Sequence, residues 1–176
     1  MIWIPNNDHM AELGIEDDRE RVLTYLRSLS FDMIDEDLAA AFVDAEAALF
    51  LRERPLGPGD RVLAGLSVAF DASCEEMWLA WRSGACLVPA ERVLVRAGHE
   101  LGPWLEKRAI TVVSTVPTLL AMWPQEALDR VRLLILGGEA CPPHIVERFA
   151  RPEREMWNTY GPTETTVVAC AAPLEP

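Results

Sequence analysis

After residue 55 the chain alternates short apolar runs, which are typical of strands, with segments that have helical periodicity. The expected strands are residues 61–66, 85–89, 110–113, 131–136 and 166–171. The expected helices are residues 74–81, 101–108, 117–123 and 142–150. Strands that alternate with helices in this way predict βαβ units and a mainly parallel sheet with flanking helices.

Residues 1–54 follow a different pattern, and the breaker P-L-G-P-G-D at residues 55–60 separates them from the rest. Two amphipathic helices are expected here, at residues 17–29 and 36–51. Such helices need a partner surface to bury their apolar faces, and this segment supplies none. The sequence therefore predicts an α/β chain whose partial parallel sheet is preceded by two helices.

The 176 residues carry a net charge of −12. This charge argues against nucleic acid and an anionic membrane as partners. The negative charge is weak support for a cationic small-molecule ligand. A contribution to solubility alone is the simpler explanation of this charge. The four cysteines form no C-x-x-C pair, no apolar run has membrane-spanning length, and the N-terminus lacks a signal-peptide pattern. We therefore expect reduced thiols and a cytoplasmic protein.

The sequence N-T-Y-G-P-T-E-T-T at residues 158–166 combines groups that suit a nucleotide. The Gly161-Pro162 pair favours a tight turn. Hydroxyls such as that of Thr163 can donate to phosphate oxygens, and Glu164 can hold a hard cation such as Mg²⁺. Tyr160 offers a flat face for a purine. A polar turn between two strands is an equally good interpretation of this segment alone.

Two further motifs lie upstream. L-G-G-E-A-C-P at residues 136–142 follows an expected strand, and its glycines allow close approach of the backbone to a ligand. A turn with a helix cap is the alternative. F-D-A-S-C-E-E-M-W at residues 70–78 places Asp71 where it can pair with an ammonium group. The same residue could instead cap the following helix.

Together these motifs resemble the amino-acid adenylation domains of non-ribosomal peptide synthetases, in the adenylate-forming superfamily. The resemblance implies an internal fragment of the N-terminal domain, which would bind ATP or AMP with Mg²⁺. It assigns the Mg²⁺ ligand to Glu164 and the substrate α-ammonium to Asp71. The nucleotide-binding residues that it implies are Gly138, Glu139, Ala140, Asn158, Tyr160 and Thr163.

The resemblance also carries over the pocket for the substrate side chain. Its residues are Asp71, Ala72, Glu75, Ser114, Ile135, Gly137, Thr159, Val167 and Val168. A buried carboxylate such as Glu75 needs a cation, and the small residues at Ala72, Ser114 and Gly137 leave room for a long side chain. We therefore expect lysine, with ornithine or another basic amino acid as the alternative. Another possibility is that Glu75 is solvated and Glu76 faces inward.

The family's P-K-G loop, Y-x-T-G-D segment and C-terminal catalytic lysine are not found in these 176 residues. Each such group typically supplies several kcal/mol of transition-state stabilisation. We therefore expect ligand binding without competent catalysis, and the rest of a synthetase as a potential partner. A non-catalytic protein-interaction or regulatory fragment is the alternative function.

Residues 1–40 resemble a piece of a different family. The W-I-P-N-N sequence at residues 3–7 and the later stretch at residues 26–29 are similar to flavin-dependent dehydrogenases of the fumarate-reductase and ketosteroid-dehydrogenase kind. This resemblance implies a helical segment of different origin at residues 1–40, followed by a partial AMP-binding domain at residues 41–176.

Overall fold

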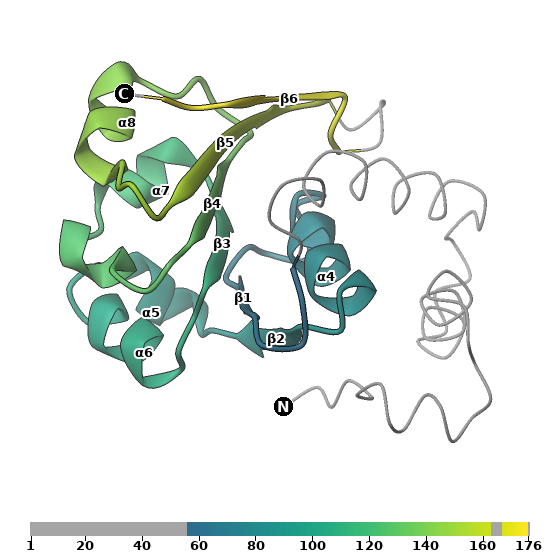
Figure 1. The fold of residues 1–176 in the computed structure, drawn as a ribbon, viewed down its shortest axis with the longest axis vertical. Coiled ribbons are helices and arrows are strands. Elements are labelled where there is room, and N and C mark those ends of the chain that lie inside the picture. The colour runs from purple at the N-terminus through teal and green to yellow at the C-terminus, as the bar shows by residue number, and fades with distance from the viewer. Residues whose placement is uncertain (1–55, 163–166, 176) are drawn as a thin grey trace.

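The computed structural model describes residues 56–162 and 167–175, which form one six-stranded sheet with helices on both faces (Figure 1). The strands are β1 (Arg61–Ala64), β2 (Cys86–Pro89), β3 (Val112–Thr115), β4 (Leu133–Leu136), β5 (Glu155–Tyr160) and β6 (Cys170–Pro173). The helices are α4 (Ser73–Arg82), α5 (Arg92–Arg96), α6 (Leu101–Lys107), α7 (Pro117–Ala121), the 3₁₀ helix η1 (Gln125–Leu128) and α8 (Pro143–Phe149).

The strands lie in the order β2-β1-β3-β4-β5-β6 and are parallel except for β6, which is antiparallel to β5. The predicted α/β class with a mainly parallel sheet is therefore confirmed. The chain first adds β2 on one side of β1 and then adds β3 on the other. This reversal leaves a crevice at the carboxyl ends of β1 and β3, where open α/β sheets place their ligands.

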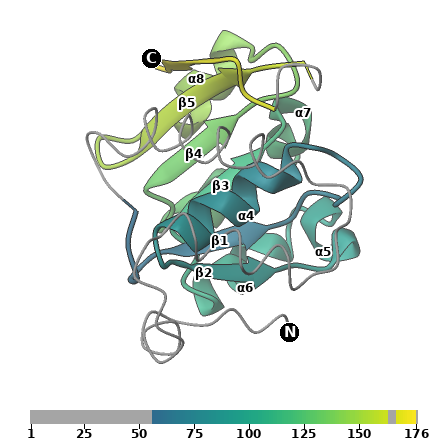
Figure 2. The same cartoon turned by 90° about the vertical axis from the view of Figure 1, so that its right-hand side faces the viewer.

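The two faces of the sheet bury separate apolar clusters. Helix α4 covers β1, β2 and β3 on one face, while α5 to α8 lie on the other (Figures 1 and 2). Strand side chains alternate between the faces. Thus Val62 and Ile135 pack on the α4 side, whereas Val113 and Leu134 pack on the opposite side.

A polar cluster at the amino ends of the strands aligns β1, β3 and β4. The Asp60 carboxylate accepts hydrogen bonds from Arg132 (2.7 and 2.9 Å), from the Thr111 hydroxyl (2.8 Å) and from the Gly57 N–H (3.0 Å). Burial raises the pKa of Asp60, but these hydrogen bonds outweigh it, so the pKa lies below its ordinary value. Because these hydrogen bonds align the amino ends of three parallel strands, the carboxyl ends of the strands lie at the same edge of the sheet.

Several sequence predictions differ from this structure. Strand β5 was not expected, because its last three residues were interpreted as part of a nucleotide motif or, alternatively, of a polar turn. Helices α5 and η1 were also not expected. The last strand lies at Cys170–Pro173 rather than residues 166–171. The N-cap of α4 is Ala72 rather than Asp71, and it makes no side-chain cap hydrogen bond. The expected helices at residues 17–29 and 36–51 lie outside the described residues.

Candidate functional site

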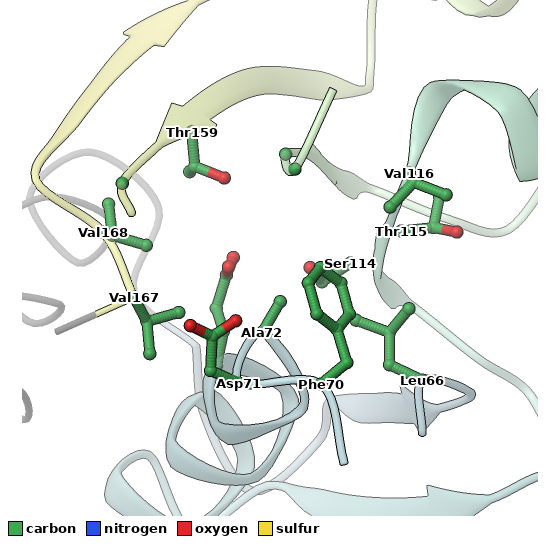
Figure 3. Close-up of a pocket in the computed structure, with 14 residues that line it drawn as sticks. Leu66, Phe70, Asp71, Ala72, Ser114, Thr115, Val116, Thr159, Val167 and Val168 are labelled. Atoms are coloured by element: carbon green, nitrogen blue, oxygen red, sulfur yellow. The ribbon is translucent and has the colours of Figure 1, made fainter. Parts of the chain in front are cut away.

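A pocket opens at the carboxyl ends of β1, β3, β4 and β5. Side chains from the ends of these strands and from the segments that follow them face a common space, with Asp71 on one side of it and Thr159 on the other (Figure 3). The lining residues are Leu66, Phe70, Asp71, Ala72, Glu75, Ser114, Thr115, Val116, Gly137, Gly138, Thr159, Gly161, Val167 and Val168. Eight of the nine predicted substrate residues are in this set, so segments distant in sequence do meet here. Ile135 is the exception, because it is fully buried in the core beneath the pocket.

Room for a ligand is limited in this conformation. The volume open to the centre of a water-sized molecule is about 40 Å³, which holds a few waters. An amino acid would therefore enter only if the walls moved apart. One wall is the Phe70 ring, which is partly exposed and lies against Gly138. Val167, on the opposite side, has a φ of 65°, a strained conformation for a β-branched residue.

Glu75 is the charged group deepest in the pocket. It is 2% exposed, and its carboxyl group is hydrogen-bonded to Ser114. The Oε1 atom is buried and has no hydrogen-bond partner among the described residues. Burial raises the pKa of Glu75 to about 8, and the bond to Ser114 offsets only part of that effect. The interpretation of Glu75 as a solvated helix residue is therefore wrong.

Glu76, the next residue, is also buried, at 1% exposure. Its carboxylate turns away from the pocket and accepts hydrogen bonds from the Gly65 and Leu66 N–H groups. Burial raises the pKa of Glu76 to about 8, and the neighbouring Glu75 adds to that shift. Both carboxylates therefore face inward, which neither sequence interpretation expected. Side-chain cations are absent from the described lining of the pocket.

Gly137 packs closely against Thr159, so this position has no room for a larger residue. A Cβ atom at this position would overlap the Thr159 hydroxyl and lie 3.2 Å from the Thr159 carbonyl oxygen. We expect Gly137→Ala to lower the free energy of unfolding by about 1–3 kcal/mol, the usual cost of overpacking. Urea denaturation measures this change. Gly59→Ala is the control, because its Cβ would meet nothing within 4 Å. Equal effects of the two substitutions would contradict the close approach at Gly137.

Two of the predicted nucleotide residues, Asn158 and Tyr160, lie at the same edge but on the other face of the sheet, whereas Gly138 lines the pocket itself. Because side chains alternate along β5, Thr159 faces the α4 side, while Asn158 and Tyr160 face the side of α7 and α8. Tyr160 is 66% exposed, so its ring is open to a ligand. The Asn158 Oδ1 atom is buried and has no partner among the described residues. It is therefore an acceptor available to an amino group.

The turn at residues 137–140 borders this second face. Gly138 has a φ of 73°, a conformation that glycine adopts without strain. The Glu139 carboxylate accepts hydrogen bonds from the Thr118 hydroxyl (2.7 Å) and the Thr118 N–H (3.0 Å). It thereby links the turn to the start of α7. Ala140 is exposed beside it.

Two predicted residues cannot be placed, since Thr163 and Glu164 lie outside the described residues. Within residues 56–162 and 167–175, no three His, Cys, Asp or Glu side chains are grouped to hold a metal ion. That part of the chain also contains no helix that is both long and apolar enough to cross a membrane. The proposed Mg²⁺ ligand therefore remains a prediction.

Sequence reasoning missed several residues of the pocket wall. Leu66, Thr115, Val116 and Gly161 line it without having been predicted. Phe70 was quoted only as part of a motif, although its position beside Asp71 was a usable signal. Leu66 and Val116 carried no signal, because apolar residues next to strands are common.

Comparisons with known proteins agree on this region. The model of the family described as AMP-binding enzyme matches residues 37–176. The chain is 48% identical over 116 residues to delta-poly-L-ornithine synthetase of Acinetobacter baumannii, which covers 66% of this chain and 9% of that protein. It is 38% identical over 123 residues to a dimodular nonribosomal peptide synthase of Bacillus subtilis, covering 68% of this chain and 5% of that protein. The chain thus spans less than a tenth of the length of these two relatives.

Solved structures give the same fold. The crystal structure of CmiS6 has a TM-score of 0.71 and 27% identity, and the match covers 81% of this chain and 35% of that one. The adenylation domain AlmE of Vibrio cholerae, solved with glycyl-adenosine-5′-phosphate, has a TM-score of 0.69 and 22% identity. That match covers 81% of this chain and 27% of AlmE.

Proposed function

The chain belongs to the AMP-binding enzyme family, and on that premise we propose that its pocket binds a basic amino acid while the adjoining face binds the adenylate. In the adenylation reaction that such a site would serve, the amino-acid carboxylate would attack the α-phosphorus of ATP and pyrophosphate would leave. The observation that carries the choice of substrate is the Glu75 Oε1 atom, which is buried and has no partner among the described residues.

The physics of Glu75 favours a cationic ligand. A buried carboxyl without a cation is costly to ionise, which is why its pKa is raised to about 8. A primary ammonium from the ligand would form a charge-assisted hydrogen bond with it and favour the ionised form. Asp71 lines the same pocket (Figure 3), and we assign the α-ammonium group to it. Two carboxylates in one pocket would thus match the two ammonium groups of lysine or ornithine.

The choice between these two amino acids depends on side-chain length. The relative with 48% identity is named for a polymer of ornithine, whereas Glu75 is the charged group deepest in the pocket, which suits the longer side chain of lysine. We propose lysine, with ornithine as the comparison ligand in any titration.

The proposed adenylate face offers groups that fit the nucleotide. The unpartnered Asn158 Oδ1 can accept from the adenine amino group, and the exposed Tyr160 ring can stack on the base. Gly138 allows the backbone of the turn to approach the base closely. Mg²⁺ would be held by Glu164, on the family resemblance alone.

Calorimetric titration tests the proposal. The ligand is a non-hydrolysable lysyl-adenylate analogue, and the leucyl analogue serves as a neutral comparison. We expect Glu75→Gln to weaken binding of the lysyl analogue by about 1.5–3 kcal/mol, the scale of a hydrogen bond to a charged group. Affinity for the leucyl analogue should not fall. Glu147→Gln, the same change at an exposed position on α8, is the control variant.

Two results would count against this function. If the wild-type chain binds neither analogue at millimolar concentration, the nucleotide and amino-acid assignments both fail, and the protein-interaction alternative gains support. If Glu75→Gln leaves the affinity for the lysyl analogue unchanged, the basic substrate is wrong even though the family stands.

A further inference from the structure

Glu76 holds the beginning of the loop that joins β1 to α4. Its Oε1 atom accepts the Gly65 N–H at 2.9 Å and the Leu66 N–H at 3.2 Å. Its Oε2 atom accepts the same Leu66 N–H at 3.2 Å. The carboxylate therefore replaces the strand partner that these two amides lack once β1 has ended at Ala64.

The loop at residues 65–70 has little else to fix it. Residues 67–70 are all exposed, and Val68 is 87% exposed. Within the loop, the Phe70 N–H donates to the Ser67 carbonyl at 2.8 Å. A segment with so few buried contacts opens easily unless its ends are held. The Glu76 bonds hold one end, and the start of α4 holds the other.

This loop matters because its two ends supply a wall of the pocket. Leu66 and Phe70 both line it, on the side opposite Val167 and Val168 (Figure 3). Glu75 and Glu76 are neighbours on α4, yet one carboxyl enters the pocket and the other binds the loop behind it. Successive residues of a helix point about 100° apart, which explains the division.

We infer that Glu76 is a positioning residue: its carboxylate fixes the Gly65 and Leu66 amides so that Leu66 and Phe70 stand as one wall of the substrate pocket. The pocket part of this inference rests on the proposed function, whereas the loop part does not. Glu76 lies outside the pocket lining and acts only through the loop.

Hydrogen exchange of the full chain tests the loop part without any ligand. Three variants differ in what they retain: Glu76→Gln keeps an acceptor oxygen in place, Glu76→Leu keeps only the volume, and Glu76→Asp keeps a carboxyl group on a shorter stem. We expect Glu76→Leu and Glu76→Asp to speed exchange across residues 65–70 by at least about tenfold. Exchange in β4 should be unchanged, and Glu76→Gln should remain close to wild type.

Titration with the lysyl-adenylate analogue tests the pocket part. We expect Glu76→Asp to weaken binding by at least about tenfold and Glu76→Gln by less than about threefold, since the amide oxygen still accepts a hydrogen bond. If Glu76 acted only through its charge, Glu76→Gln would not retain the affinity for the analogue. Glu76→Asp also serves if Glu76→Leu does not fold.

The outcomes separate the two claims. If the amides of residues 65–70 exchange in Glu76→Asp at the wild-type rate, the positioning role is overturned, whatever the affinity for the lysyl-adenylate analogue. If exchange rises but analogue affinity stays at the wild-type value, the loop does not serve the pocket and the inference also fails. If wild type itself binds no analogue, the proposed function fails, and the exchange data still decide whether Glu76 holds the loop.

Discussion

Raising the pH from about 5 to about 8 should destabilise the ligand-free chain. Burial raises the pKa values of Glu75 and Glu76 to about 8, against 4.5 for an ordinary glutamate. Between these values the folded chain keeps protons that the unfolded chain has released. The free energy of unfolding therefore falls as the pH rises, by about 1.4 kcal/mol per pH unit for each such proton. Below pH 4.5 both states are protonated, and this loss is absent.

Glu75→Gln should reduce that loss. Glutamine has no proton to release, and it also removes the charge that disfavours ionisation of Glu76. We expect the slope of unfolding free energy against pH to fall to about half its wild-type value. Urea denaturation at several pH values measures the slope. Glu147→Gln should leave it unchanged, because Glu147 is exposed on α8. An unaltered slope in Glu75→Gln would contradict a protonated, buried Glu75.

Arg154→Met should cost the chain much of its stability. Arg154 is 8% exposed, and its guanidinium donates three hydrogen bonds to backbone carbonyls: to Val131 at 2.9 Å, and to Phe149 and Leu128. It thus joins the end of α8 and the end of η1 to the start of β4. Burial lowers the pKa of Arg154, yet these bonds keep its donors satisfied. Methionine fills a similar volume but offers no donor.

We expect a loss of about 3–5 kcal/mol, because each buried carbonyl left without a partner costs about 1–3 kcal/mol. The Leu128 carbonyl keeps one hydrogen bond, from the Val131 N–H at 2.9 Å, so it contributes less to the loss of stability than the other two carbonyls. Such a loss is a large part of the about 5–15 kcal/mol that stabilises a typical domain. Arg151→Met is the matched control, since Arg151 is exposed and should contribute less than about 0.5 kcal/mol. Similar denaturation midpoints for the two variants would refute the role given to Arg154.

The parts of the fold that sequence patterns predicted share one property: their side chains are apolar and flanked by breakers. All four residues of β3 and of β4 are buried, as are the two inner residues of β1, so apolar runs marked these segments. Strand β5 lacks this signal. Its last residues, Asn158, Thr159 and Tyr160, are polar and lie at the candidate site. The polar residues that identified the motif therefore also removed the apolar pattern by which the strand could have been predicted.

The site could be predicted in outline but not in its geometry. Motifs placed Asp71, Glu75 and Thr159 in one pocket, and the structure brings them together. They could not reveal that Asn158 and Thr159, adjacent in sequence, serve opposite faces of the sheet, because that follows only once the segment is known to be a strand. Glu76 was equally hidden, since its partners are backbone amides of a loop ten or eleven residues away.

The antiparallel return of β6 along β5 brings Val167 and Val168 to the edge where Leu66 and Asp71 already stand. The pocket is therefore closed by the two ends of the described chain, with β3 and β4 between them. Contacts between residues so distant in sequence form late, because a long loop must close before they gain anything. A partly folded chain with only some of its strands paired would hold pieces of both walls and yet bind nothing. If the proposed function holds, ligand affinity would be a measure of completed folding as much as of side-chain chemistry.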